Sequence, residues 1–437
     1  MKPLPGFVLL GGLLLLAGRT ASGQPDPVPV AEPSFESLND ALGAALWQDN
    51  NLWDDPIAAV AARIPLPPES KTSVDRSFRW YPPSNLRLLG ARPYSVSLLG
   101  TVENSTRISI VFANKGDFGG LGLIHSQAAQ ATGSARTRLN NAGKDLIREL
   151  PGAIRADARA IEKLLTDLLG PAATQRNQIA GAASEPLQRW NWKGHAILLA
   201  VRDRDYAALR IVPTAVADSN ETPDRVRDAA LRTALKQRIE RRANGDVILS
   251  DIPMVDQGPK GFCVPATMER TLRYLGIAAD MYLLAMLGDT AAGGGTSVDA
   301  MVESVTGMVR SSGRRVEKFP SNLRITNIRR AIDDGLPILW SIHVAPALDE
   351  SLTQRAIQRA ATPTAEAWKP ILKKWTKLAG RPVIQRQLGH ICLIVGYNAE
   401  TDELAISDSW GPAFRERWIT IDEASVISAD DLRIIDF

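Results

Sequence analysis

The sequence of 437 residues predicts an α+β fold, with helical and extended segments in both its N-terminal and its C-terminal part. Apolar residues recur every three or four positions in residues 126–169, as in a helix with one buried face. Apolar and polar residues alternate in residues 96–102 and 107–113, which is typical of half-buried strands. Residues 403–421 show a strand, a tight turn and another strand, the pattern of an antiparallel meander.

The composition is that of a globular protein of two or three domains. Apolar residues make up 45% of the chain and charged residues 23%, so the chain can bury ordinary cores and is not disordered. Its 51 basic and 48 acidic residues form no long run of one sign, which argues against a nucleic-acid partner. No cluster of His, Cys and Asp has the spacing of metal ligands, so we expect neither a metal nor another cofactor.

The N-terminus has the features of an export signal. Lys2 supplies the positive charge, residues 7–17 form an apolar stretch too short to span a bilayer, and the small residues 21–23 are a cleavage site. We therefore expect residues 1–23 to be a signal peptide and the protein to be secreted or periplasmic, with no stable membrane span after cleavage. An uncleaved N-terminal anchor is the alternative.

Three parts follow the signal peptide. Residues 24–37, in which Pro and Val alternate, are predicted to be a flexible linker. Residues 38–245 are predicted to form a mixed α+β region of unknown function, and residues 246–437 a second α+β domain. The boundary is placed at the turn signal of Asn244 and Gly245, between a charged helix and a strand.

The first elements of the N-terminal region are predicted to be helices and then strands. Helical spacing covers residues 38–64, in which Pro56 follows two aspartates as a first-turn proline should. The two strands at 96–102 and 107–113 come next. The long helix at 126–169 is predicted to break near Pro151, because proline removes a backbone hydrogen bond and clashes with the preceding turn.

The second half of the N-terminal region is predicted to contain a loop, two strands and a helix. Residues 170–188, rich in Gly, Ala and Gln, are predicted to be a loop, and residues 189–213 two adjoining strands. His195 starts one of these strands, and we interpret it as a half-buried strand histidine rather than a catalytic group. A charged helix is predicted over residues 223–242.

The C-terminal domain places one of only two cysteines of the chain at the start of a helix. After a strand, residues 253–261 are rich in Gly and Pro and therefore irregular, and helical apolar spacing begins at Cys263. Unpaired N–H groups at a helix start stabilise a thiolate, which is the nucleophilic form of cysteine. Free cysteine is also among the most buried residue types, so this position alone leaves an inert thiol open.

A cysteine nucleophile needs a base, and His390 is the well-placed candidate. It lies in the apolar strand of residues 388–398, which ends in a turn. Asp408 ends a following strand, where its carboxylate could fix the tautomer and orientation of the imidazole. Trp410 follows in a Ser-Trp-Gly turn, where it would keep water away from the pair.

This order of residues resembles papain-like cysteine peptidases, and most closely their bacterial branch akin to the double-glycine, bacteriocin-leader peptidases. The resemblance covers about 190 C-terminal residues and rests on Gln257, on Cys263 six residues later, on the Gly-His strand and on Asp-Ser-Trp-Gly. It implies a papain-like fold, with a helical part packed on an antiparallel sheet. It also implies that Cys263 is the nucleophile, His390 the general base and acid, Asp408 its orienting partner and Gln257 an oxyanion donor.

The chain departs from the plant and lysosomal members of that superfamily. Those members have Cys-Gly-Ser-Cys-Trp around the nucleophile, whereas Cys263 stands in Lys-Gly-Phe-Cys-Val-Pro, and Asp408 replaces their usual asparagine. Gly294 and Gly295 match the place where related enzymes run a glycine backbone past the substrate, although a plain flexible loop would look the same. With Trp410, they are the candidate substrate-binding residues.

The resemblance predicts an exported cysteine peptidase with a peptide or protein substrate. Three alternatives stay open: a catalytically silent papain-like binding module, a transglutaminase-like acyl transferase, and an N-terminal region that is an inhibitory propeptide. A disulfide between Cys263 and Cys392 is a further alternative. Residues 347–381, charged and helical, are predicted to be an insertion over one end of the cleft.

Overall fold

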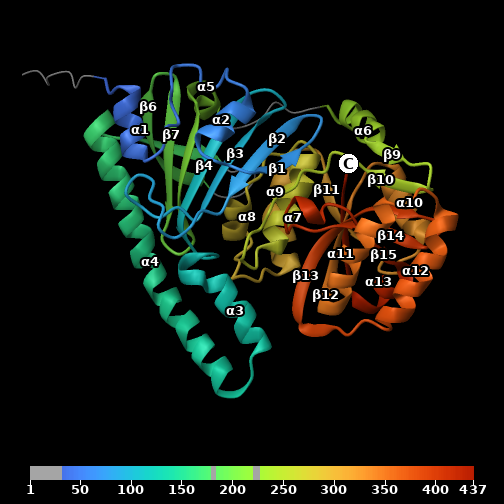
Figure 1. The fold of residues 1–437 in the computed structure, drawn as a ribbon. Helices are drawn as coiled ribbons and strands as arrows, with labels where there is room; N and C mark the ends of the chain where they lie inside the picture. Colours follow the sequence, from blue (N-terminus) through green and yellow to red (C-terminus); the bar gives the residue numbers. More distant parts are fainter. Residues whose placement is uncertain (1–31, 179–183, 220–226) are drawn as a thin grey trace, which may run out of the picture. The chain divides into compact units, whose positions relative to one another are not determined.

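The fold is that of a computed structural model, which describes residues 32–178, 184–219 and 227–437 (Figure 1). The predicted signal peptide, residues 1–23, and most of the predicted linker lie outside the described residues. Within the described part, the helices accompany two antiparallel sheets, which confirms the predicted α+β class. Of the helices described, none combines the length and the apolar character that a membrane crossing requires.

The first sheet is built entirely from the N-terminal region, and each strand pairs antiparallel with its neighbours. In spatial order its strands are β1 (Pro68–Lys71), β2 (Asp75–Trp80), β3 (Ser95–Thr101), β4 (Ser105–Asn114), β8 (Tyr206–Pro213), β7 (His195–Arg202), β6 (Ser184–Trp192) and β5 (Ala173–Gln178). The predicted strands at 96–102 and 107–113 correspond to β3 and β4. Sequence alternation did not predict β1 and β2, whose residues are mostly charged or polar.

Several helices belong to this region, and the longest packs on the sheet. They are α1 (Phe35–Leu42), α2 (Ile57–Arg63), η1 (Phe118–Gly120), α3 (Leu121–Gln130), α4 (Gly133–Leu169) and α5 (Thr214–Asp218). In Figure 1, α3 and α4 run side by side as a hairpin.

The predicted break of the long helix at Pro151 is wrong. α4 continues through Pro151, with Leu150 and Ile154 buried on either side of it. These residues continue one apolar stripe that packs against the sheet, and this packing outweighs the local cost of the proline.

Three other predicted boundaries also change. The predicted loop at 170–188 contains β5 and the first half of β6, with residues 179–183 not described. The predicted helix at 223–242 is α6 (Asp228–Gln237), followed by the short strand β9 (Ile239–Arg241). The predicted helical stretch 38–64 is two helices, and α1 begins at Phe35, inside the predicted linker.

His195 is buried completely instead of half-buried. Its Nδ1 atom lies 3.1 Å from the carbonyl oxygen of Trp192, and the rings of Trp47 and Trp53 pack beside it. Burial lowers the pKa of His195. It is therefore a core residue of the first sheet.

The second sheet carries the C-terminal domain and is also antiparallel. In spatial order it contains β11 (Arg315–Phe319), β16 (Ser428–Asp436), β12 (Ile338–Val344), β13 (Gln385–Asn398), β10 (Asp246–Leu249) and β9. The strands β14 (Glu403–Ser407) and β15 (Arg417–Thr420) extend from β13 and form the predicted meander. The domain boundary at 245 stays a prediction; α6 and β9, which precede it, pack with this second sheet.

The helices of this part surround the sheet and its long central strand β13. They are α7 (Cys263–Tyr274), α8 (Met281–Leu287), α9 (Val298–Ser311), α10 (Ile325–Asp333), α11 (Pro346–Ala360), α12 (Ala365–Ala379), η2 (Pro412–Phe414) and α13 (Ile421–Ile427). α11 and α12 lie in the chain between β12 and β13, as the predicted insertion does.

α7 is buried almost all round, although its sequence contains several charges. Val264 and Met268 pack in the core of the second sheet, and Ala266 packs in a cluster that includes first-sheet residues. Arg270 donates hydrogen bonds to the carbonyl oxygens of Pro253 (2.9 Å) and Ser407 (3.1 Å). The charged face of the helix is therefore paired with protein groups, which fixes α7 between the two sheets.

Candidate active site

Cys263 is the first residue of α7, as predicted from the Gly/Pro-rich loop before it. The helix lies across β13, where the hydroxyl of Thr267 donates to the carbonyl oxygen of Ile391 at 3.3 Å. This contact brings the start of α7 beside His390, the residue before Ile391. The Cys263 side chain is partly exposed, whereas Cys392 is completely buried, and both are free thiols.

His390 lies between Cys263 and Asp408. Its Nε2 atom is 2.8 Å from Oδ1 of Asp408, and the imidazole also forms a hydrogen bond with the Cys263 side chain. An ionised carboxylate can only accept, so Nε2 carries the hydrogen that Asp408 binds. The indole of Trp410 stacks on the imidazole, with ring centroids 4.5 Å apart, and covers one of its faces. The structure thus brings together Cys263, His390, Asp408 and Trp410.

The electrostatics of these groups favour a thiolate and an imidazolium. Burial alone raises the pKa of Cys263, but the hydrogen bond and the charge of His390 outweigh burial and lower it. Burial lowers the pKa of His390, whereas the hydrogen bonds with Asp408 and Cys263 raise it, to about 10 in total. Burial raises the pKa of Asp408, and its contacts with His390 and Arg417 bring it below its ordinary value. Each partner therefore stabilises the charge of the other.

The side chain of Gln257 is buried and held at both ends. Its Oε1 atom accepts a hydrogen bond from the hydroxyl of Ser409 at 2.7 Å, and its Nε2 atom donates to the carbonyl oxygen of Lys260 at 2.7 Å. Its backbone N–H donates to the carbonyl oxygen of Ser409 at 2.8 Å. The amide nitrogen carries two hydrogens, so one remains for a further acceptor. Ser409 thus joins the Gln257 loop to the turn that contains Asp408 and Trp410.

Gly294 packs against the loop before Cys263. Gly261 and Gly294 form a parallel bridge, and the N–H of Gly295 donates to the carbonyl oxygen of Gly261 at 3.1 Å. A Cβ on Gly294 would lie 2.4 Å from the Cα of Gly261, so this position excludes every side chain. Gly295 has open space around its Cα and a φ of 89°, so its left-handed backbone is what favours glycine there.

Residues 249–429 match the model of the Peptidase_C39 like family. No curated protein matches the chain. The family match is consistent with the papain-like cysteine peptidase superfamily and confirms the resemblance drawn from the sequence. It supports a peptidase-like function in general terms, with peptides as the class of substrate. The segment 249–429 is called the C39-like segment below.

Within the C39-like segment, Arg417 is a site residue that sequence reasoning missed. It lies on β15, is almost completely buried, and its Nη2 atom is 2.6 Å from Oδ2 of Asp408. The same nitrogen is 3.2 Å from Oδ1 of Asp349 on α11. Arg417 stands two residues before Ile419 on β15, so the two side chains share one face of the strand. This alternation was the available sequence signal that Arg417 is buried. These groups thus form a chain from the partly exposed Asp349 through the buried Arg417 and Asp408 to His390.

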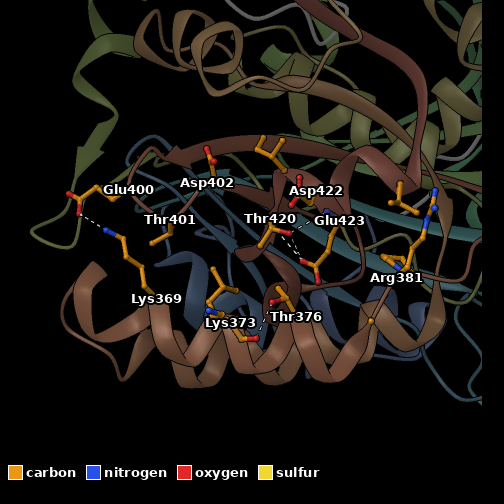
Figure 2. A pocket seen from close by; sticks show the side chains of 15 residues that line it. Lys369, Lys373, Thr376, Arg381, Glu400, Thr401, Asp402, Thr420, Asp422 and Glu423 are labelled. Atoms are coloured by element: carbon orange, nitrogen blue, oxygen red, sulfur yellow. Dashed lines mark hydrogen bonds and ion pairs between the residues drawn. The ribbon is translucent and has the colours of Figure 1, made fainter.

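The C39-like segment also contains a pocket away from these groups. It encloses about 630 Å³ beside α12, and Figure 2 shows its lining. Lys369 on α12 pairs there with Glu400 at 3.7 Å, and Thr420 and Glu423 cap the start of α13 on the other side. The pocket shares no lining residue with the candidate active site.

The candidate site contains no set of metal ligands. In residues 32–178, 184–219 and 227–437, no three His, Cys, Asp or Glu side chains lie close enough to hold a metal ion. The chemistry that these residues can supply is that of a thiolate, an imidazolium and amide donors.

Proposed function

We propose that the chain is a cysteine peptidase that hydrolyses peptide bonds through Cys263, His390 and Asp408, with Gln257 as an oxyanion donor. The observation that carries this proposal is that His390 contacts the Cys263 thiol on one side and the Asp408 carboxylate on the other. This order of nucleophile, base and orienting group is what covalent acyl-transfer chemistry requires. The match of the C39-like segment is in keeping with it.

In the first half of the reaction, the thiolate of Cys263 attacks the carbonyl carbon of the scissile amide. The oxyanion that forms accepts hydrogen bonds from the free Nε2–H of Gln257 and from the backbone N–H of Cys263. The His390 imidazolium then gives its proton to the leaving amine as the C–N bond breaks. A thioester on Cys263 remains.

In the second half, water resolves the thioester. Neutral His390 takes a proton from the water as its oxygen bonds to the acyl carbon, and the bond from carbon to Sγ breaks. The peptide acid leaves and the thiolate and imidazolium are restored. Trp410, stacked on His390, limits the access of other water molecules to the ring.

We also propose that the protein acts outside the cytoplasm, after removal of residues 1–23. The proposal rests on the charge, apolar stretch and small residues of that segment. N-terminal sequencing of the protein from culture medium or periplasm tests it, with a new N-terminus near Gln24 as the expected result. An intact residue 1 in the exported protein would contradict it.

The test of the catalytic proposal uses the full chain and fluorescein-labelled casein. We expect the wild type to cleave casein, Cys263→Ala to have no activity, and Gln257→Ala to lose about a hundredfold in turnover. Iodoacetamide should alkylate Cys263 and spare Cys392, because burial raises the pKa of the Cys392 thiol and the side chain has no exposed surface. Cleavage by Cys263→Ala at the wild-type rate would refute the peptidase assignment.

The same assay separates hydrolysis from acyl transfer and from simple binding. With glycine methyl ester present, a hydrolase yields free acids, whereas a transferase yields products heavier by the added amine, which mass spectrometry resolves. Casein that binds without cleavage, together with equal labelling of Cys263 and Cys392 or of neither, would favour a binding module.

A further inference from the structure

The loop that carries Gln257, residues 250–261, is held by the first sheet. The N–H of Asp256, the residue before Gln257, donates to the buried carboxylate of Glu69 at 2.8 Å, and the hydroxyl of Tyr81 donates to the carbonyl oxygen of Asp256. The N–H of Met254 donates to the hydroxyl of Ser70 at 3.0 Å. These contacts come from β1 and from Tyr81, the residue that follows β2. The backbone of the Gln257 loop is therefore bonded to the N-terminal region.

Lys260 extends from this loop toward the N-terminal region. Its side chain has no exposed surface, and its Nζ atom lies 3.2 Å from Oδ2 of Asp117, in the loop after β4. The ammonium also lies 4.2 Å from the ring centroid of Tyr81 and 5.5 Å from that of Tyr282. Taking an ammonium out of water is costly unless it is paired, so Asp117 and the rings hold Lys260 in one place.

The backbone of the same lysine contacts the candidate oxyanion donor. The Lys260 carbonyl oxygen is the acceptor of the 2.7 Å hydrogen bond from Nε2 of Gln257. In the proposed mechanism, a shift of the Lys260 side chain would move this carbonyl and with it the Gln257 amide that binds the oxyanion. Catalytic donors are sensitive to such shifts, because their effect depends on placement at the transition-state oxygen.

The loop after β4 holds the glycine segment as well. The N–H of Gly293 donates to the carbonyl oxygen of Lys115 at 2.6 Å, two residues before Asp117. Gly294 then packs against Gly261, which follows Lys260. One loop of the N-terminal region thus contacts both backbone segments that flank the start of α7.

We propose that Lys260 is a positioning residue for Gln257, and that Asp117 of the N-terminal region sets its place. The inference rests on the proposed peptidase function, since it concerns the same oxyanion donor. On this inference the N-terminal region is required for full activity. An inhibitory propeptide would have the opposite effect, because its release would raise activity.

The experiment compares two substitutions of the same kind in the full chain. Asp117→Asn removes the charge that pairs with Lys260. Asp75→Asn, the matched control, removes the charge that pairs with Arg273 at 2.8 Å, a second link between the N-terminal region and α7, near its other end. Fluorescein-casein turnover reports on the oxyanion donor, whereas the rate of Cys263 alkylation by iodoacetamide needs no oxyanion.

We expect Asp117→Asn to lower kcat by about tenfold to a hundredfold, up to the effect of losing one oxyanion donor. The alkylation rate of Cys263 should stay within about twofold of wild type, and Asp75→Asn should keep full turnover. In the Gln257→Ala background, Asp117→Asn should cause little further loss, because a residue that acts through Gln257 has no effect once Gln257 is absent.

Three results would overturn the inference. They are unchanged or increased turnover in Asp117→Asn, an equal loss of turnover and alkylation, and a loss that multiplies with that of Gln257→Ala. Casein cleavage by Cys263→Ala would instead refute the proposed function, whatever Asp117→Asn does. Failure of the inference and failure of the function are thus distinguishable.

Discussion

Replacing Asp408 by asparagine is expected to move the alkaline limit of activity downward. Asp408 accepts the Nε2–H of His390 at 2.8 Å, and this contact contributes to a His390 pKa of about 10. Hydrogen bonds to a charged group are worth about 1.5–3 kcal/mol and those between neutral groups about 0.5–1.5 kcal/mol. Replacing the carboxylate by the asparagine amide therefore weakens the hydrogen bond to His390 by about 1–1.5 kcal/mol. Since 1.36 kcal/mol corresponds to one pKa unit, the pKa of His390 should fall by about one unit.

The assay is the pH dependence of casein cleavage, measured from about pH 6 to about pH 11. His390 must be protonated to supply the leaving amine, so the alkaline limb should lie near pH 10 in the wild type and about one pH unit lower in Asp408→Asn. Asp402→Asn is the control, because Asp402 is exposed and its φ of 53° suits asparagine. Alkaline limbs at the same pH in all three proteins would refute the role given to Asp408.

The raised pKa of His390 has a second consequence, for stability. A histidine whose folded pKa exceeds its unfolded value of 6.5 stabilises the fold fully below that value. This contribution is lost as the pH rises through about 10. In Asp408→Asn this stabilising contribution should be lost completely at a lower pH than in the wild type. The free energy of unfolding in urea, measured at a series of pH values, tests this expectation.

Other substitutions test the surroundings of His390. Arg417→Met leaves a buried carboxylate without its guanidinium, so we expect a loss of about 3–5 kcal/mol in the free energy of unfolding by urea; an unchanged midpoint would contradict the pairing. Gly294→Ala should lower the melting temperature more than Gly295→Ala, because only the first Cβ would meet backbone; equal effects would show that φ alone decides. Trp410→Ala should lower casein turnover about tenfold and Trp410→Phe much less, as expected for a stacked ring; equal losses would argue against stacking.

The elements that carry Cys263, His390 and Asp408 could be predicted from local signals, whereas Gln257 and the roles of all four residues came from the family resemblance. A Gly/Pro-rich loop ends where helical spacing starts, and this places Cys263 at a helix start. The apolar strand β13 carries His390, and Asp408 follows the next strand, β14. The antiparallel meander pairs these two strands. That these residues meet in one site was inferred from the order of the motifs along the chain. No sequence spacing predicts the contact between α7 and β13.

The groups that hold the site could not be predicted in the same way. Lys260 and Arg417 are charged residues, which are normally exposed, and each is paired with an aspartate far away in the chain. Lys260 meets Asp117 from the loop after β4, and Arg417 meets Asp349 from α11. Local patterns contain no information about such pairs.

Long-range packing also decided the elements that sequence patterns assigned wrongly. The strands β5 and β6 are rich in Gln, Arg and Asn, and they form because β7 offers an edge with which β6 pairs. α4 passes Pro151 without ending because the buried stripe of the helix matches the sheet beneath it. Propensity is a weak signal where a neighbouring element supplies the hydrogen bonds or the apolar contacts.

The contact of Asp349 with Arg417 limits how the protein can be re-engineered. α11 lies in the segment between β12 and β13 that was predicted to be an insertion. Its first turn supplies Asp349, whose carboxylate shares the Nη2 atom of Arg417 with the carboxylate of Asp408. A chimera that replaces this insertion must bring an acid to the position of Asp349, or Arg417 loses one of its two counter-charges and keeps only Asp408. The insertion and the candidate triad are therefore not independent modules.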